Sequence, residues 1–388
     1  MPVALVINGP NLNLLGFRRP DIYGSTTLAH LESLCRGWGE ALGWRVETFS
    51  SNHEGDLVDR LHEARGAVDG VVLNAGALSH YSYALHDAIE AVEAPVVEVH
   101  ISNVAEREPW RRQSVIGPAC VATVYGRGID GYRHALSHLA LRRAWPGEPH
   151  RYGEHSDQVG DLRVPGGGGR MAAVAILHGG FWRHMWKRDL MDAVAVDLAR
   201  RGLVTWNIEY RLLGSGGGYP QTFADVAAAV DYLAKLEPVD QDRVAFLGHS
   251  AGGHLALWAA SRSHLPPGRP GARPLVRPRL AVGLAAISNV AADPGLDGGA
   301  AGEFVGDAPL AEVSPFHMLP PDAPVLLAHT SGDDRVPVEQ SRSYLRATSA
   351  AGGDCELLES VAGDHFMYLD AAEPAWQAVA DRIVEALR

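Results

Sequence analysis

Short apolar runs alternate with longer stretches of helical periodicity along the first 140 or so residues. An apolar run bounded by turn residues predicts a buried strand, and apolar positions spaced three and four apart predict an amphipathic helix. Five strands are expected, at 3–7, 45–49, 70–73, 96–99 and 119–125. Four helices are expected in the same region, at 28–42, 56–67, 82–92 and 132–143. This alternation predicts an α/β domain whose parallel sheet is covered on both faces.

A second alternation of strand and helix patterns follows residue 153. It predicts strands at 161–164, 174–177, 203–207, 244–248, 280–284, 325–329 and 355–358. Its long helical patterns include 186–201, 222–235 and 252–263. The intervening segment RRAWPGEPHRYG is rich in proline and glycine, which indicates a linker. For 388 residues two domains are the natural expectation, so we predict domains at 1–143 and 153–388 joined by 144–152.

Composition limits the partners and cofactors that we expect. The net charge of -12 argues against a nucleic-acid partner, because phosphate binding needs clustered Lys and Arg. No apolar run approaches the length of a membrane span, so no membrane partner is expected. The three cysteines, Cys35, Cys120 and Cys355, indicate no disulfide framework and favour a cytoplasmic location. The histidines show no metal-ligand spacing, and we expect neither a metal nor an organic cofactor.

Polar residues follow three of the strands predicted in the first domain. They are Asn8, Asn74 and His100. Because the carboxyl ends of parallel strands form one edge of a sheet, we expect these residues to share a site there. Glu98 lies on the same face of its strand as His100. Its carboxylate is therefore placed to accept one N–H of the imidazole and fix its tautomer.

The loop after the first strand, NGPNLNLLGFRRPDIYG, carries Arg18, Arg19 and Tyr23. A tyrosine is normally a poor base at neutral pH, but neighbouring cations stabilise its phenolate form. A loop with these side chains beside a strand end is therefore a candidate for proton abstraction. A polar surface loop whose tyrosine covers the core is the alternative.

This loop and four later segments, in the same order, resemble type II 3-dehydroquinate dehydratases. The later segments are SNHEGDLVDRLHEA, LNAGALSHYSYALHDAI, EVHISN and GRGIDGYRHAL. The resemblance implies a flavodoxin-like domain that dehydrates 3-dehydroquinate to 3-dehydroshikimate through an enolate. It implies Tyr23 as the base and His100 as the acid that protonates the departing hydroxyl. It also implies Arg18 as the cation that stabilises the phenolate and the transition state.

The resemblance also implies which residues bind the substrate. The carboxylate is placed at Ile101 and Ser102, where backbone N–H groups and a hydroxyl donate hydrogen bonds. The ring hydroxyls are placed at Asn74, His80, Asp87 and Arg111, with Arg107 as a weaker candidate. The family assembles as dodecamers built from trimers, with a neighbouring subunit contributing near Asp87. A homo-oligomer, as large as a dodecamer, is therefore expected.

Two features of this half qualify the resemblance. Arg19 stands where the family commonly has an acidic residue before the proline. A second cation would stabilise the Tyr23 phenolate further, or would break a contact that closes the loop. This keeps open an alternative in which the first domain is an inactive oligomerisation scaffold or a ligand sensor displaying an active hydrolase. The segment GRGIDG fits GxGxxG but follows the last strand, so it predicts a tight turn rather than a nucleotide site.

The second half contains GHSAG after the apolar run VAFL and before a helical pattern. This is the strand–turn–helix context of a nucleophile elbow, with Ser250 as the nucleophile. His365, in AGDHFMYLD, is the expected base, and Asp333, in SGDDRVPVEQS, is the expected acid. The order Ser250, Asp333, His365 is that of α/β-hydrolases. Asp334 competes with Asp333 for the acid role, but the D-x-x-V-P spacing favours Asp333.

The segment HGGFW follows an earlier strand, and its glycines let backbone N–H groups approach an oxyanion. We assign this hole to Gly180 or Phe181 together with Ala251; Trp182 either shapes an acyl pocket or packs in the core. HGGFW, GHSAGG and YGEHSDQVGDLRVP resemble α/β-hydrolases of the esterase and kynurenine formamidase group. The resemblance implies serine acylation and hydrolysis of a small ester or formyl amide. Fusion to a dehydratase suggests esters of quinate-type alcohols as a third substrate class.

Overall fold

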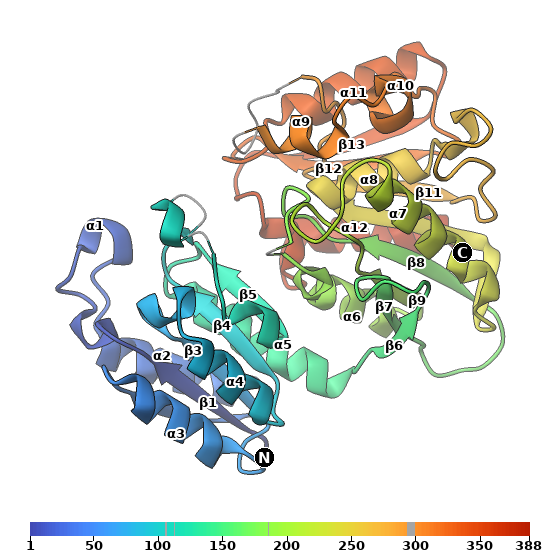
Figure 1. Ribbon diagram of the computed structural model, residues 1–388. Helices are drawn as coiled ribbons and strands as arrows, with labels where there is room; N and C mark the ends of the chain where they lie inside the picture. Colours follow the sequence, from blue (N-terminus) through green and yellow to red (C-terminus); the bar gives the residue numbers. More distant parts are fainter. Residues whose placement is uncertain (105–106, 112, 185, 293–298) are drawn as a thin grey trace. The chain divides into compact units, whose positions relative to one another are not determined.

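The computed structural model describes residues 1–388 except 105–106, 112, 185 and 293–298 (Figure 1). The chain divides into two compact units, Met1–Ala144 and Trp145–Arg388. Each unit has its own sheet, and each is described by itself.

The first unit contains five parallel strands in the order β2-β1-β3-β4-β5. They are β1 (Val3–Asn8), β2 (Arg45–Ser50), β3 (Gly70–Asn74), β4 (Val96–His100) and β5 (Ala122–Tyr125). The chain adds β2 on one side of β1 and the remaining strands on the other. The strand order therefore reverses beside β1, which is where ligands bind in open α/β sheets. The flavodoxin-like fold expected from the sequence is confirmed.

Helices cover both faces of this sheet. One face packs against α2 (Leu28–Ala41) and α5 (Asp130–Ala144), and the other against α3 (Glu54–Ala64) and α4 (Tyr83–Ala91). Successive strand residues divide between the two cores because side chains alternate along a strand: Val6 enters the first core and Leu5 the second. The short helix α1 (Pro20–Tyr23) lies in the loop after β1.

The second unit contains an eight-stranded sheet in the order β13-β12-β11-β10-β8-β9-β7-β6. The strands are β6 (Glu148–Arg151), β7 (Val159–Arg163), β8 (Met171–Leu177), β9 (Val204–Ile208), β10 (Val239–His249), β11 (Leu280–Leu284), β12 (Val325–Thr330) and β13 (Cys355–Ser360). The strands from β13 to β9 pair in parallel, whereas β7 and β6 are antiparallel. The expected α/β-hydrolase fold is confirmed.

Part of the segment expected to be a linker belongs to this sheet. Residues Glu148–Arg151 form β6, which pairs with β7 at the edge. The sequence EPHR has no apolar run, so its strand character could not be recognised by periodicity. A proline is tolerated there because an edge strand leaves one row of N–H groups unpaired.

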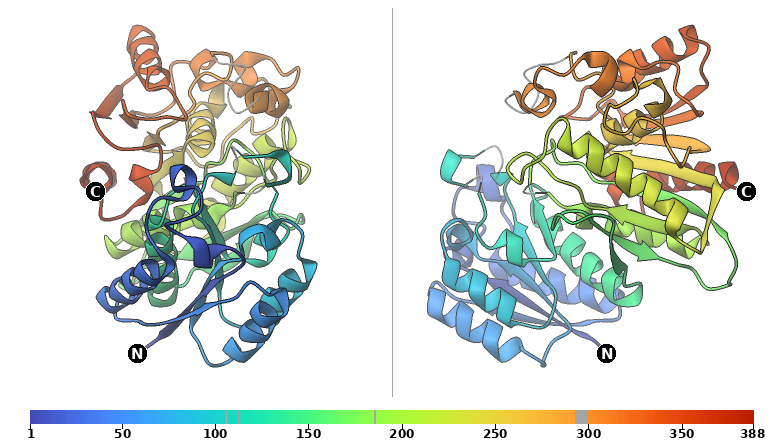
Figure 2. Two further views of the ribbon diagram at one scale, coloured as in Figure 1. Left: turned by 90° about the vertical axis from the view of Figure 1, so that its left-hand side faces the viewer. Right: turned by 45° about the vertical axis from the view of Figure 1, so that its right-hand side comes forward.

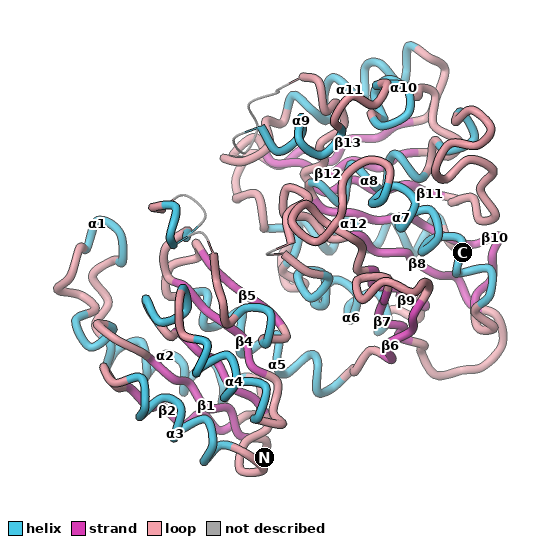
Figure 3. Tube along the Cα trace, in the orientation of Figure 1, coloured by secondary structure: helices cyan, strands magenta, loops and turns pink. Residues whose placement is uncertain are grey.

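Helices also cover both faces of the second sheet (Figures 2 and 3). One core includes side chains from α7 (Gln221–Asp231), α8 (Ala251–Ala259) and α11 (Glu339–Ala350), and the short helices α9 (Ala300–Val305) and α10 (Leu310–Val313) add to it. The other core includes α6 (Asp192–Arg200) and α12 (Pro374–Ala386). The helix expected at 186–201 is shorter than predicted, because it is preceded by a 3-10 turn at Arg188–Met191. Within the described residues no helix has the length and apolarity needed to cross a bilayer.

Candidate active sites

A pocket lies at the carboxyl ends of the strands in the first unit. Eight of the residues expected from the sequence line it: Arg18, Tyr23, Asn74, His80, His100, Ile101, Ser102 and Arg111. They come from the loop after β1, from the last residues of β3 and β4, and from the segments that follow these two strands. The parallel topology therefore brings together residues that are spread over almost 100 positions of the sequence.

His100 is paired with a buried carboxylate. Its Nε2 lies 2.7 Å from Oε1 of Glu98, which is fully buried on the same strand. The Ser114 hydroxyl lies 2.8 and 2.9 Å from the two carboxylate oxygens. Burial alone would raise the pKa of Glu98, but the charge of His100 and these hydrogen bonds hold that pKa below its ordinary value. An ionised Glu98 accepts the Nε2–H of His100 and leaves Nδ1 as the ring nitrogen for other partners.

Two guanidinium groups lie beside Tyr23. Arg107 donates through Nη1 to the Tyr23 hydroxyl at 3.4 Å and to the Ser102 hydroxyl at 3.2 Å. The guanidinium carbon of Arg18 lies 5.8 Å from the centre of the tyrosine ring. Arg107, the weaker candidate in the sequence, is thus in direct contact with the phenol oxygen. The only feature of the sequence that pointed to Arg107 was its position in the basic segment after β4.

Asn74 is held by a buried tyrosine that the sequence analysis missed. The Tyr132 hydroxyl donates to Oδ1 of Asn8 at 2.6 Å and accepts from Nδ2 of Asn74 at 2.9 Å. Oδ1 of Asn74 accepts from the Gly76 N–H at 3.2 Å. Burial raises the pKa of Tyr132 well above its ordinary value, so this hydroxyl stays protonated. Tyr132 therefore joins the ends of β1 and β3 beneath the pocket wall.

His80 and Arg111 line the pocket, and both contact the exposed ring of Trp110. Nδ1 of His80 lies 2.8 Å from the Gln113 carbonyl oxygen, to which it donates, and the ring stacks on His100 with centroids 5.8 Å apart. Trp110 meets His80 edge-on, and the Arg111 guanidinium lies 4.0 Å from the Trp110 ring centre. Burial, with the charges of His100 and Arg111, holds the pKa of His80 below its ordinary value.

Two residues singled out in the sequence, Asp87 and Arg19, are not among the residues that line the pocket. Asp87 is exposed on α4 and is not among the pocket residues. Arg19, directly before α1, has a φ of 45°. This left-handed conformation is uncommon for residues other than Gly, Asn and Asp. Asp87 and the weaker candidate Arg107 are thus the expected substrate ligands that are not among the residues lining this pocket.

Ser250 occupies a sharp turn between β10 and α8 in the second unit. Its φ and ψ of 56° and -119° are strained for a residue with a side chain. A Cβ at Gly248 would collide with the Gly252 carbonyl, and a Cβ at Gly252 would collide with the Leu177 carbonyl. The glycines of GHSAGG are therefore required by backbone contact, as a nucleophile elbow needs.

Asp333 and His365 form a buried pair. Oδ2 of Asp333 lies 2.7 Å from Nδ1 of His365, and Oδ1 accepts from the backbone N–H groups of Arg335 and Val336 at 2.8 Å. Burial alone would raise the pKa of Asp333, but hydrogen bonds from His329 and His365 hold it far below its ordinary value. The competing Asp334 side chain is 70% exposed, so the geometry favours Asp333 as the acid.

His365 lies beside the nucleophile through its contact with the preceding residue. The rings of His249 and His365 are 4.6 Å apart, and Nε2 of His249 donates to the His365 carbonyl oxygen at 2.9 Å. The Ser250 hydroxyl is buried and makes no hydrogen bond within the described residues. The structure thus brings the three residues to one place but shows only the Asp333–His365 bond directly.

The HGGFW segment forms a loop against Ser250. Gly180, Phe181 and Trp182 all have positive φ, at 113°, 51° and 58°. A Cβ at Gly179 would lie 3.0 Å from Cβ of Ser250, so this backbone touches the nucleophile. Ala251 begins α8 directly after the nucleophile. These positions suit backbone N–H donors aimed at an oxyanion.

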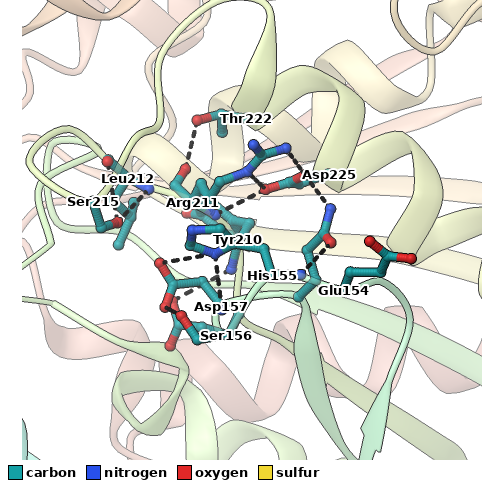
Figure 4. A network of polar contacts seen from close by, with 12 residues as sticks. Glu154, His155, Ser156, Asp157, Tyr210, Arg211, Leu212, Ser215, Thr222 and Asp225 are labelled. Carbon is teal, nitrogen blue, oxygen red and sulfur yellow. Dashed lines mark hydrogen bonds and ion pairs between the residues drawn. The ribbon is translucent and has the colours of Figure 1, made fainter.

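One residue and one segment of the hydrolase motifs pack or brace the fold. Trp182 is fully buried and stacks on Phe304 at 4.6 Å, which indicates packing in the core. The YGEHSDQ segment is tied to α7 through a polar network (Figure 4). In it Arg211 donates to both oxygens of Asp225, at 2.8 and 2.6 Å, and Gln158 donates to the same carboxylate at 2.6 Å. This motif therefore braces the loop after β9.

The loop after β8 is also braced by a pair that the sequence analysis missed. Nε2 of His178 lies 3.0 Å from Oε1 of Glu209, and both side chains are buried. The Tyr210 hydroxyl donates to the His178 carbonyl oxygen at 2.5 Å.

In the described part of the chain no three His, Cys, Asp or Glu side chains gather as metal ligands would.

Comparison with known proteins distinguishes the two units. The family model "Dehydroquinase class II" matches residues 2–140, and the family model BD-FAE matches residues 161–265. The 3-dehydroquinate dehydratase 2 of Ralstonia nicotianae is 56% identical over 146 residues, which is 36% of this chain and 95% of that protein. The catabolic 3-dehydroquinase 1 of Neosartorya fischeri is 52% identical over 137 residues, 35% of this chain and 91% of that protein.

The second unit is similar in fold to solved esterases. A thermophilic esterase of Thermogutta terrifontis, solved with butyrate bound, aligns with a TM-score of 0.53 at 22% identity. The alignment covers 62% of this chain and 92% of the esterase. Residues 2–140 therefore make the chain a member of the class II dehydroquinase family, and an α/β-hydrolase domain with an esterase-like fold follows them.

Proposed function

We propose that the chain is a bifunctional enzyme that dehydrates 3-dehydroquinate in the first unit and hydrolyses a small ester in the second. The observation that supports the first activity is the pocket in which Tyr23 and His100 face a common space, each with its charged partner. The observation that supports the second is the Asp333–His365 pair beside a strained serine turn.

In the dehydratase, the Tyr23 phenolate removes a proton from the carbon next to the substrate carbonyl. Arg107, in contact with the phenol oxygen, and Arg18 stabilise the negative charge that moves from the phenolate to the enolate. The enolate then expels the β-hydroxyl as water while the His100 imidazolium supplies the proton. Glu98 stabilises that imidazolium.

The proposed ligands divide the substrate between two groups. Ile101 and Ser102 bind the carboxylate, while Asn74, His80 and Arg111 bind the ring hydroxyls; all line the pocket. Asp87 would act from one subunit on the pocket of another, since it is exposed on α4. That role requires the homo-oligomer expected for this family.

In the hydrolase, Ser250 attacks the acyl carbonyl while His365 takes its proton and Asp333 stabilises the imidazolium. The oxyanion binds the N–H groups of Gly180 or Phe181 and of Ala251. His365 then protonates the leaving group, and water activated by the same histidine releases the acid.

The hydrolase substrate is proposed to carry an aromatic group. The ring of Phe366 lies 5.2 Å from that of His365, and Trp186 lies 6.0 Å from Phe366. Trp186 also packs against Gly180 of the oxyanion loop. An aryl ester or a formyl anilide such as N-formylkynurenine would stack on these rings.

A second candidate substrate follows from the joining of two units in one chain. An ester of a quinate-type alcohol would release a ring that, after oxidation of one hydroxyl, becomes the substrate of the dehydratase. Resemblance of the first unit to a catabolic dehydroquinase supports such a degradative sequence.

The test is one panel on the intact protein: 3-dehydroquinate, followed by the absorbance of the enone product, then phenyl acetate, N-formylkynurenine and acyl-quinate esters. Tyr23→Phe should abolish only the first activity, and Ser250→Ala only the others. A folded wild-type protein that gives no enone would favour the scaffold or sensor alternative, for which Arg19 is the motivating feature. Absence of turnover with acyl-quinate esters would exclude quinate-type esters as the substrate of the hydrolase.

A further inference from the structure

A second histidine contacts the carboxylate of Asp333. His329 is fully buried near the end of β12, and its Nε2 lies 3.1 Å from Oδ2 of Asp333. The same nitrogen lies 2.9 Å from the Val336 carbonyl oxygen. Both neighbours are acceptors, so Nε2 carries a hydrogen and shares it between them. Oδ2 of Asp333 therefore receives N–H groups from both His329 and His365.

The other ring nitrogen of His329 has a partner that suits this tautomer. Nδ1 lies 2.8 Å from the Ser341 hydroxyl on α11. A hydroxyl can donate to the bare nitrogen of a neutral imidazole. The hydrogen bonds then run in one direction, from Ser341 to His329 and from His329 to Asp333. The Ser341 contact is thus compatible with a proton on Nε2.

These contacts fix the orientation of the carboxylate. The backbone N–H groups of Arg335 and Val336 hold Oδ1, and His329 holds Oδ2. With both oxygens bonded, rotation about the Cβ–Cγ bond would break buried hydrogen bonds, which is costly. The lone pair of Oδ2 that faces His365 is therefore kept in place.

We propose that His329 is a positioning residue of the hydrolase, acting through Asp333 to hold His365 in the tautomer and orientation that general-base catalysis requires. This proposal rests on the proposed serine-hydrolase function. His329 touches no reacting atom in it. Its contribution is to the rate of the chemical step and not to substrate binding.

The test compares His329→Leu, which removes the donor, with His329→Gln, whose amide restores one near the position of Nε2. His264→Leu is the matched control, because Nε2 of His264 bonds to the Pro320 carbonyl oxygen at 2.8 Å on a partly exposed turn. We expect His329→Leu to lower kcat for p-nitrophenyl acetate about 10- to 100-fold with KM nearly unchanged. The Gln variant should recover most of that loss, and the control should match wild type.

A second readout needs no substrate. The proton shared by Asp333 and His365 should give a low-field NMR resonance, and its loss in Asp333→Asn would assign it. His329→Leu should move this resonance, and Ser341→Ala, a smaller change, should move it in the same direction if the Leu variant does not fold. If His329→Leu moves the resonance but the wild-type protein hydrolyses no ester, the positioning role of His329 stands. The proposed ester substrate is then rejected.

Three results would overturn the proposal. The first is a folded His329→Leu variant whose kcat stays within about twofold of wild type. The second is an unmoved low-field resonance in every folded variant of His329 and Ser341. The third is a Gln variant that is folded but no better than Leu, which would assign the loss to packing.

Discussion

Replacing Glu98 with glutamine removes one charge from the dehydratase site and changes little else. Glutamine has the same length, and its amide oxygen still accepts one hydrogen bond. In the wild-type protein the carboxylate accepts from Nε2 of His100 at 2.7 Å and from Ser114 at 2.8 Å. The variant therefore tests whether the negative charge, rather than the shape of the side chain, keeps His100 ready to donate a proton.

The expected loss follows from the burial of the pair. Glu98 is fully buried and His100 is 6% exposed, so solvent does not screen their interaction. A hydrogen bond to a charged group contributes about 1.5 to 3 kcal/mol. At about 1.4 kcal/mol per factor of ten, kcat should fall roughly 10- to 150-fold. Because the charge stabilises the imidazolium, the alkaline limb of the pH profile of kcat should move to lower pH.

The assay is enone formation from 3-dehydroquinate across a pH series. Glu93→Gln is the matched control, since Glu93 pairs with Arg65 on the surface, where both side chains are more than half exposed. The control should keep wild-type kcat. A Glu98→Gln variant with wild-type kcat and an unmoved alkaline limb would refute the assigned role of the carboxylate.

Three further outcomes are expected. Tyr132→Phe leaves Asn8 and Asn74 without their shared hydroxyl, so thermal unfolding of the first unit should show a loss of about 1 to 3 kcal/mol; an unchanged melting temperature would contradict this. Burial lowers the pKa of His254 to about 4, so folding excludes a proton that the unfolded chain binds below pH 6.5. Stability should fall by about 3 kcal/mol from pH 7 to pH 4, and urea unfolding of His254→Phe should show a smaller fall than wild type. Trp186→Ala should lower kcat/KM for phenyl acetate more than for methyl acetate, and equal losses would argue against an aromatic subsite.

Strands buried on both faces, such as β1 and β3, were predictable because they are nearly continuous apolar runs. Four of the five strands of the first unit were placed within a residue or two at each end, β4 among them. The strand expected at 119–125 begins later, at Ala122, because Gly117–Ala119 forms a 3-10 turn. The edge strand β6 has no apolar run and was assigned to the linker. The exposed edge strands β2 and β13 were still predicted because they carry apolar residues, which β6 lacks.

The site residues differ in how far the sequence could predict their contacts. Glu98 and His100 are two positions apart on a strand, and alternation alone places them on one face. Arg107 and Tyr23 meet through two loops separated by 84 positions, a distance over which no local pattern acts. His329 is only four positions from Asp333, but their contact depends on how the chain turns after β12. The motifs therefore identified the loops and strands that carry the site residues. The contacts between distant residues could be known only from the fold.

Both units pair an imidazole with a buried carboxylate, but through opposite ring nitrogens. Glu98 bonds to Nε2 of His100, whereas Asp333 bonds to Nδ1 of His365. The nitrogen not bonded to the carboxylate is therefore Nδ1 in the first unit and Nε2 in the second. In the proposed mechanisms the first histidine begins its step as a charged acid, and the second becomes charged only after taking the serine proton. Loss of the first carboxylate should therefore change the population of the reactive form and move a pH limb. Loss of the second should raise the barrier while leaving the base in its reactive neutral form.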